Sequence, residues 1–243
     1  MLLETITASS AQFDESFTDT MSLIGPRPYE SVDIGHRYLA NQPSRRRHQA
    51  QVHLHSAENV HTSISDIYAA DRQELESFVH GIFQQAYGAD VKEFMPQLMS
   101  LRNDQGELLA VCGLRHAENT SLFLERYLEQ PVEQMIAEKT GQSVYRGDIV
   151  EIGNLAVAHP ETARSLLASI SVYLHGTQTA WGVFTGIPTL RNALSKLNML
   201  LLPLGVAALS HLPEHEHASW GRYYDEKPYV MAVQRLLPPK SAI

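Results

Sequence analysis

The stretch IVEIGNLAV, residues 149–157, carries one acid and one amide in a run that is otherwise apolar or glycine. Its length and its β-branched content predict a buried strand. A carboxylate in the interior of such a strand costs free energy unless it is paired, neutralised or directed into a wet cleft. Glu151 is therefore either the partner of a cation or a group that faces a solvent-reachable groove. The rest of the sequence has to be considered to choose between these two roles.

Upstream of this strand, helical periodicity is clearest in residues 69–89, where apolar residues recur every three or four positions and Gly88 follows as a stop. Residues 96–117 are typical of two strands joined by the turn NDQG. The remaining elements are predicted as a short segment and then a helix between Pro131 and Gly141, a helix over 159–178 with Pro160 in its first turn, a strand over 180–186, a helix over 188–198, a buried strand or loop over 199–209 and a last strand over 228–236.

With a short alternating strand at residues 51–55, the order of elements is β, α, β, β, α, β, α, β, α, β, β. An antiparallel hairpin first and βαβ units later predict an α/β (more strictly α+β) fold, with a mixed sheet and helices on both faces. Residues 1–50 have irregular hydrophobicity, with PRP at 26–28 and QPSRRR at 42–47. We expect them to form a poorly packed N-terminal extension, and residues 51–243 to form one domain.

Composition and charge restrict the function classes. Of the 243 residues, 44% are apolar and 19% charged, which is typical of a globular chain. The net charge of −8 argues against a nucleic-acid surface, which needs clustered positive charge. The basic run Arg45–Arg46–Arg47 fits a solvated linker, or a docking patch for an anionic lipid or a carrier protein.

Cysteine content and hydropathy bear on the compartment. Cys112 is the single cysteine, so an intramolecular disulfide is impossible and a reducing compartment, the cytoplasm, is expected. The start MLLETITASS lacks the basic residues of a signal peptide. No segment approaches the roughly 18 apolar residues of a membrane helix, so we expect no membrane span, while peripheral contact with a membrane stays open.

Several segments, in order and spacing, resemble the bacterial family of thermostable hemolysins over residues 65–234. They are DRQELESFVHGIFQQAYGA, FMPQLMSLRNDQGELLAVCGLRHA, SLFLERYLEQPVEQMI, IVEIGNLAV and WGRYYDEKPYVMAV. The order of elements is also similar to the GNAT acyltransferase fold and, more distantly, to its acyl-homoserine-lactone synthase branch. This resemblance implies a GNAT-like, mostly antiparallel central sheet and an acyltransferase. The positions that correspond to functional positions of the synthases are Arg72, Phe78, Tyr87, Arg115, Arg126, Pro131, Glu151 and Asn154.

The sequence departs at two places, once from the lactone-synthase pattern and once from the GNAT pattern. The synthases keep an arginine where this chain has Asn154, which puts lactone formation itself in doubt. Many GNAT enzymes carry a glycine-rich loop that closes on a coenzyme A pyrophosphate at a helix N-terminus, whereas this chain has HPETARSLL with Glu161. An acyl carrier protein is therefore a plausible acyl donor beside coenzyme A, and no tightly bound cofactor is expected.

In a GNAT-like fold, Glu151 would lie beside the central cleft and take the proton released when an amine attacks a thioester. Partial desolvation would raise its pKa and help it act as a base. An exposed backbone amide, or the Asn154 side chain, could donate to the thioester oxygen as negative charge develops. The alternative is that Glu151 is an edge or ion-pair residue.

Two arginines are candidate ligands for a substrate carboxylate. Arg72 begins a helix, where a cation is unfavourable to the helix dipole and a specific partner is reasonable; an ion pair with Glu76 at i+4 is equally compatible. Arg115 ends an apolar strand and could bind a carboxylate bidentately, or could pair with Glu118 or Glu125.

The other candidates carry weaker signals. Tyr223 and Tyr224 could line the acyl or acceptor pocket or pack against the last strand. Cys112 is expected to be buried and inert. The histidines of HLPEHEHASW lie on a polar loop, and we expect no metal site there.

Three functions fit these patterns. The first is an N-acyltransferase that moves a fatty acyl group from acyl carrier protein or coenzyme A to the amine of a small polar acceptor such as an amino acid. The second is a membrane-active hemolysin, acting directly or through a detergent-like acylated product, although no long apolar or amphipathic segment supports direct lysis. The third is a non-catalytic acyl-binding module. Acyl length, acceptor and oligomeric state are not encoded in these patterns.

Overall fold

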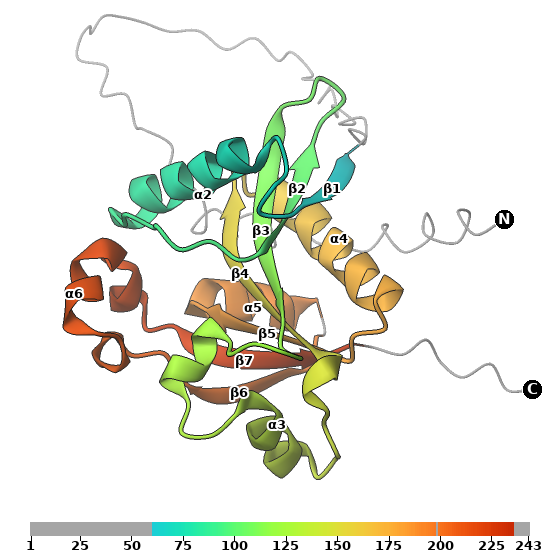
Figure 1. The fold of residues 1–243 in the computed structure, drawn as a ribbon, viewed down its shortest axis with the longest axis vertical. Coiled ribbons are helices and arrows are strands. Elements are labelled where there is room, and N and C mark those ends of the chain that lie inside the picture. Colours follow the sequence, from blue (N-terminus) through green and yellow to red (C-terminus); the bar gives the residue numbers. More distant parts are fainter. Residues whose placement is uncertain (1–59, 198, 236–243) are drawn as a thin grey trace, which may run out of the picture.

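A computed structural model describes residues 60–197 and 199–235, and in it the predicted elements from residue 69 onward appear in the predicted order (Figure 1). The strands are β1 (His61–Ser65), β2 (Gln97–Arg102), β3 (Leu108–His116), β4 (Ile149–Val157), β5 (Trp181–Gly186), β6 (Leu201–Val206) and β7 (Tyr229–Gln234). The main helices are α2 (Arg72–Tyr87), α3 (Val132–Thr140), α4 (Thr162–Gly176) and α5 (Pro188–Lys196), with a short α6 (Glu214–His217) and the 3-10 helix η1 (Phe123–Tyr127).

The helix and strand boundaries agree closely with the local signals. Gly88 and Gly141 end α2 and α3 in the left-handed conformation that glycine adopts without steric cost. Pro160 lies two residues before α4 rather than inside its first turn. The β1 strand at His61–Ser65 was not predicted, and the predicted strand at 51–55 and the extension 1–50 lie outside the described residues.

The seven strands form one sheet in the order β1-β2-β3-β4-β5-β7-β6. Every neighbouring pair is antiparallel except β4 and β5, which run parallel. The predicted mixed, mostly antiparallel sheet is therefore confirmed. The segment 199–209 supplies β6, an edge strand that is largely half-exposed rather than buried, which is where Pro203 can be accommodated without losing a ladder hydrogen bond.

Helices cover both faces of the sheet (Figure 1). On one face, here called the α4 face, Leu166 and Ile170 of α4 and Leu190 of α5 pack in one core cluster with Ile152 and Phe184 of the sheet. On the opposite face, the α2 face, α2 packs on β3 and β4, and η1, α3 and the segment 207–224 cover the strands nearer β6. The sheet is thus the middle of three layers.

The sheet opens at one point, between β4 and β5. Their parallel pairing runs from Ile149 opposite Trp181 to Ile152 opposite Phe184 and then stops. Beyond it β4 continues along β3, while β5 continues along β7. A shift in the β3–β4 register at the same place sets Asn154 and Leu155 opposite the single residue Cys112, which is the arrangement of a β-bulge. The stretch 149–157 therefore parts from its parallel neighbour just after Ile152, the residue that follows Glu151.

Candidate active site

A cavity of about 500 Å³ lies where β4 and β5 part, and residues of both faces of the sheet line it. Ile152 and Phe184 belong to the α4-face core, whereas Glu151, Phe123 and Tyr127 belong to the α2 face. Because the strands have separated here, side chains from the two faces border one continuous space. The cavity thus has two halves that meet at the end of the β4–β5 pairing.

The α4-face half is mostly apolar, and Ser171 and His175 of α4 and Arg235 after β7 are its polar lining residues. It is lined by side chains of the sheet, of α4 and α5 and of the residues that follow α5: Ile152, Phe184, Val233, Leu167, Ile170, Leu174, Leu190, Leu194, Met199 and Leu200. An aliphatic chain placed among these groups would remove apolar surface from water, at roughly 0.8 kcal/mol for each buried methylene. This half therefore suits a hydrocarbon ligand.

The α2-face half combines charge with aromatic rings. Glu151 and Arg115 lie in its wall, together with the aromatic residues Phe83, Phe94, Phe123, Tyr127, Trp220 and Tyr223. Asp90, Lys92 and Glu93 of the loop before β2, and His215, Glu216 and Ser219 of the segment after β6, border it. This half therefore suits a small ligand that carries polar groups.

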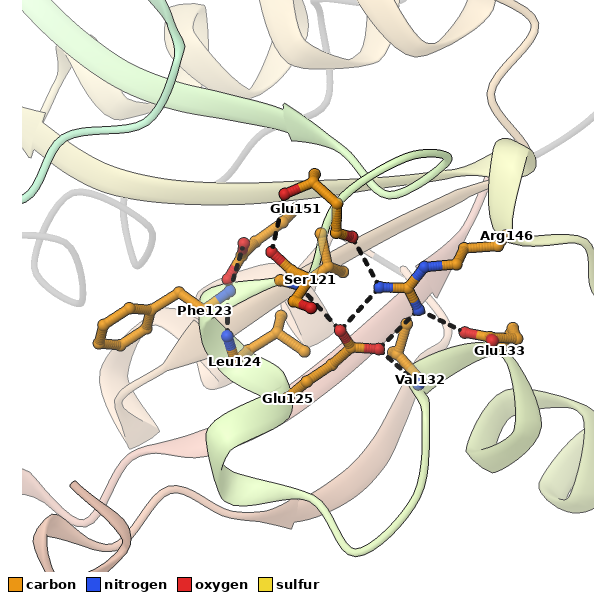
Figure 2. Close-up of polar contacts among 10 residues, drawn as sticks. Ser121, Phe123, Leu124, Glu125, Val132, Glu133, Arg146 and Glu151 are labelled. Atoms are coloured by element: carbon orange, nitrogen blue, oxygen red, sulfur yellow. Dashed lines mark hydrogen bonds and ion pairs between the residues drawn. The ribbon is translucent and has the colours of Figure 1, made fainter. Parts of the chain in front are cut away.

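The carboxylate of Glu151 is held by the backbone of η1 (Figure 2). Only 2% of the residue is exposed, and its two oxygens accept hydrogen bonds from the backbone N–H groups of Phe123 (2.9 Å) and Leu124 (2.8 Å). Arg115 Nη1 lies 3.8 Å from Oε2. Burial raises the pKa of the Glu151 carboxyl above its ordinary value, and the two N–H groups and the charge of Arg115 offset this only in part. A base with this setting would keep a fixed orientation and a strengthened affinity for a proton.

A second cluster fixes η1 itself (Figure 2). Glu125 and Arg146 form two parallel hydrogen bonds of 2.7 Å, and Arg146 Nη1 also donates to Glu133 of α3 (2.7 Å). The carboxylate of Glu125 accepts the backbone N–H groups of Leu122 (2.9 Å) and Val132 (3.1 Å). The start of η1 and the start of α3 are thereby tied together, so the N–H groups that hold Glu151 have a defined position.

Asn154 lines the cavity, but its side chain is engaged by the loop before β2. Its Oδ1 accepts the backbone N–H of Met95 (2.9 Å), and its Nδ2 donates to the carbonyl of Glu93 (3.2 Å). The residue adopts φ +46°, a left-handed conformation that asparagine tolerates better than most residues. The Asn154 side chain thus holds the loop before β2 with its oxygen and one N–H, and donation to a thioester oxygen from its second N–H stays a prediction.

Of the two alternatives for Arg72, the structure shows the ion pair with Glu76. Its guanidinium bonds Glu76 (2.6 Å) and the carbonyls of Met95 (2.7 Å) and Pro96 (3.3 Å), and the residue does not line the cavity. The i+4 ion pair is thus present, and both terminal nitrogens of the guanidinium also donate to backbone carbonyls. Arg72 therefore holds the same loop as Asn154, through the carbonyl of Met95 rather than its N–H.

The other predicted site residues fall into those that line the cavity and those that do not. Arg115 and Tyr223 line the cavity, whereas Phe78, Tyr87, Arg126 and Tyr224 do not. Arg126 pairs with Glu216 (2.9 Å) and lies over the Phe123 ring. The Tyr87 ring meets Tyr223 edge-on, and the Tyr224 hydroxyl bonds that of Tyr127, a wall residue. Arg126, Tyr87 and Tyr224 thus contact residues of the cavity wall without lining the cavity themselves.

Several residues of the cavity wall were not predicted as site residues from the sequence. Phe83 belongs to the apolar repeat of residues 69–89, and no pattern singles out Met95, Phe123, Tyr127 or Trp220. They converge from α2, the loop before β2, η1 and the segment 214–226. As predicted, Cys112 is buried, and burial raises the pKa of its thiol to about 12. Within residues 60–197 and 199–235, no group of three or more histidine, cysteine or acidic residues could hold a metal ion.

The sequence model of the thermostable hemolysin family matches residues 66–237. The chain belongs to this family. No curated protein matches it in sequence. For the described residues of this hemolysin-family protein, no helix has the length and apolar character needed to cross a membrane.

The likeness to a solved structure confirms the predicted fold. The AHL synthase LasI superposes with a TM-score of 0.50 at 9% identity, over 74% of this chain and 91% of its own. FeeM, an N-acyl amino acid synthase from uncultured soil microbes, gives a TM-score of 0.47 at 15% identity, over 72% and 91%. At such identities the likeness concerns the fold, and the activity of the hemolysin-family protein has to be argued from its own site.

Proposed function

We propose that this protein is an N-acyltransferase that moves a fatty acyl group from an acyl thioester to the amine of a small polar acceptor such as an amino acid. The observation that carries the proposal is the position of Glu151. Its carboxylate lies in the wall of a cavity where an apolar half meets a polar, aromatic half. An acyl chain in the first half and an amine in the second would meet beside this group.

The reaction can be written with the residues of the site. The amine nitrogen attacks the thioester carbonyl carbon, the C–N bond forms, and the nitrogen proton passes to Glu151 directly or through a water molecule. Collapse of the tetrahedral intermediate breaks the C–S bond, and the same proton then neutralises the departing thiolate. The products are an amide and a free thiol. Only the neutral amine attacks, and its nitrogen becomes acidic as the C–N bond forms, so Glu151 takes the proton at that stage.

Arg115 fits the role of carboxylate ligand for an amino acid acceptor. It stands beside Glu151 on the α2 face and lines the cavity. A carboxylate on this cation would place the α-amine of the same molecule near the base. Its planar donor pattern suits two parallel hydrogen bonds to a carboxylate.

For the acyl donor we favour an acyl carrier protein over coenzyme A. The segment before α4 reads HPET, without the glycine residues that let a backbone approach a pyrophosphate. A carrier protein delivers its thioester on a single arm and depends on contacts outside that loop. Parallel assays with the two thioesters of one acyl group decide between them.

A non-catalytic acyl-binding module is the second candidate, because the apolar half of the cavity alone would serve it. Mass spectrometry of lipid extracts from cells that express the wild type or Glu151→Gln separates the two. A new acylated amine present only with the wild type supports the transferase and identifies acceptor and chain together. A protein that carries bound acyl groups in both cases, with no new amide, supports the binding module.

A further inference from the structure

The strand surface beside Glu151 carries no side chains of its own. Gly153 is two residues from Glu151 on β4 and so shares its face of the sheet, and Gly113 is its direct partner on β3. Two paired glycines leave a flat patch next to the carboxylate on the α2 face. Glycine residues in a strand allow another part of the chain or a ligand to approach the backbone closely.

Met95 covers this patch. A β-carbon added to Gly113 would lie 2.8 Å from Met95 Cβ, and one added to Gly153 would overlap the end of the Met95 thioether chain. Met95 is 7% exposed and lines the cavity. The methionine side chain therefore shares the cavity wall immediately beyond Glu151 with the glycine of β4.

The backbone of Met95 is held from both sides. Asn154 accepts its N–H and Arg72 donates to its carbonyl, at 2.9 and 2.7 Å. The side chain has no comparable restraint, since an unbranched thioether changes rotamer easily and fills irregular space. The main chain is thus fixed while the part that faces the ligand is adjustable, which is a suitable arrangement for a residue that sets the size of a subsite.

We infer that Met95 is a specificity-determining residue that limits the size of the amine acceptor beside Glu151. This inference rests on the proposed acyl transfer, with the acyl chain in the apolar half and the acceptor on the α2 face. Shortening Met95 exposes the glycine patch and admits a bulkier acceptor. Adding a methyl group at Gly153 pushes the thioether into the cavity and restricts the site to the smallest acceptors.

The test is a competition assay. Purified full-length protein receives one acyl thioester and an equimolar mixture of amino acids from glycine to tryptophan, and the amide products are quantified by mass spectrometry. Met95→Ala is expected to raise the ratio of the bulkiest to the smallest product by at least about tenfold, since one or two methylene groups in a pocket discriminate by that order. Gly153→Ala is expected to lower the ratio, and Gly153→Ala combined with Met95→Ala to raise it again.

Met99→Ala is the matched control, because Met99 is equally buried on β2 but does not line the cavity. It should leave the product ratio within about twofold of the wild type even if stability falls. If Met95→Ala fails to fold, Met95→Val and Gly153→Ala carry the same test.

The outcomes are distinct. Product ratios that move in opposite directions for Met95→Ala and Gly153→Ala, with Met99→Ala unchanged, support the inference. Amide formation at wild-type ratios in both variants overturns it and leaves the transferase proposal standing. Equal loss of all products, with ratios unchanged, reduces Met95 to a structural role. No amide from the wild type with any donor overturns the proposed function and the inference together.

Discussion

Arg115 and Glu151 lie directly opposite each other on β3 and β4, with 3.8 Å between Nη1 and Oε2. At this distance the pair is an ion pair without a hydrogen bond, and the carboxylate oxygens accept the backbone N–H groups of η1. The guanidinium acts on Glu151 through its charge, and Arg115 also lines the cavity. One residue would thus tune the base and bind the acceptor.

This arrangement predicts a shifted pH dependence for Arg115→Gln. The charge of Arg115 lowers the pKa of Glu151, so its removal raises that pKa further. Because the ionised carboxylate is the base, the rise of kcat/KM with pH should move to higher pH, and KM for an amino acid acceptor should increase. Arg115→Lys should keep the pH dependence nearer that of the wild type while losing bidentate binding. An unchanged pH profile in Arg115→Gln contradicts the coupling.

Glu125 is predicted to contribute stability through the cluster that fixes η1. Burial alone would raise the pKa of Glu125, but the hydrogen bonds from Arg146 and from the backbone N–H groups of Leu122 and Val132 outweigh burial and lower it. Because the pKa of Glu125 is lower in the folded protein, its ionised carboxylate stabilises the fold at pH values above the unfolded pKa, near 4.5. This contribution disappears as the pH falls through the folded pKa. Glu125→Gln should lose about 1–3 kcal/mol in urea unfolding at pH 7, and the difference should shrink in acid.

The control for this experiment is Glu138→Gln, on the exposed surface of α3. It should change the free energy of unfolding by no more than about 0.5 kcal/mol. A loss for Glu125→Gln that stays constant from pH 7 into acid would mean that the ionised carboxylate is not the source of the stability.

Glycine at position 221 is predicted to stabilise the place where the segment 214–226 crosses the end of α2. It has φ +51° and ψ −123°, and an added β-carbon would overlap the carbonyl oxygen of Tyr87 and lie 2.7 Å from the carbonyl carbon of Gly88. Backbone hydrogen bonds Arg222 N–H to Tyr87 O (2.9 Å) and Asp90 N–H to Ser219 O (2.7 Å) flank it. Gly221→Ala should cost about 1–3 kcal/mol and raise KM, because this segment carries Trp220 and Tyr223 of the wall.

Gly81→Ala provides the contrast, since a β-carbon there meets no atom within 4 Å and the position is inside α2. It should stabilise the protein by up to about 1 kcal/mol. Thermal unfolding together with hydrogen exchange over 214–226 measures both variants. Normal protection of this segment in Gly221→Ala would show that the backbone relaxes around the added methyl group.

The fold was predictable because its signals are local. The apolar stripe of α2, the NDQG turn and the glycine stops each depend on residues within a few positions. Glu151 was identified for the same reason, as a carboxylate inside an apolar run. The insertion of β7 between β5 and β6 was not predictable, since strand order depends on packing between distant segments.

The roles of Arg72 and Asn154 illustrate the limit for the site. Arg72 meets carbonyl groups 23 and 24 residues away, and Asn154 bonds a loop 59 residues away. Neither contact leaves a pattern in the sequence around these residues. Asn154 was a candidate oxyanion donor, and Arg72 was a candidate carboxylate ligand or partner of Glu76; both hold the loop that presents Met95. The glycine pair under Met95 likewise becomes visible only through the β3–β4 register.

The most direct measurement is acceptor-dependent release of thiol from an acyl thioester by purified wild type and Glu151→Gln. Loss of a positioned base typically costs 10²–10⁴-fold, and we expect a fall of about that size in kcat. The variant should still fold and bind the donor, and Glu138→Gln should release thiol at the wild-type rate. A Glu151→Gln protein that folds, binds the acyl donor and releases thiol as fast as the wild type would contradict the account.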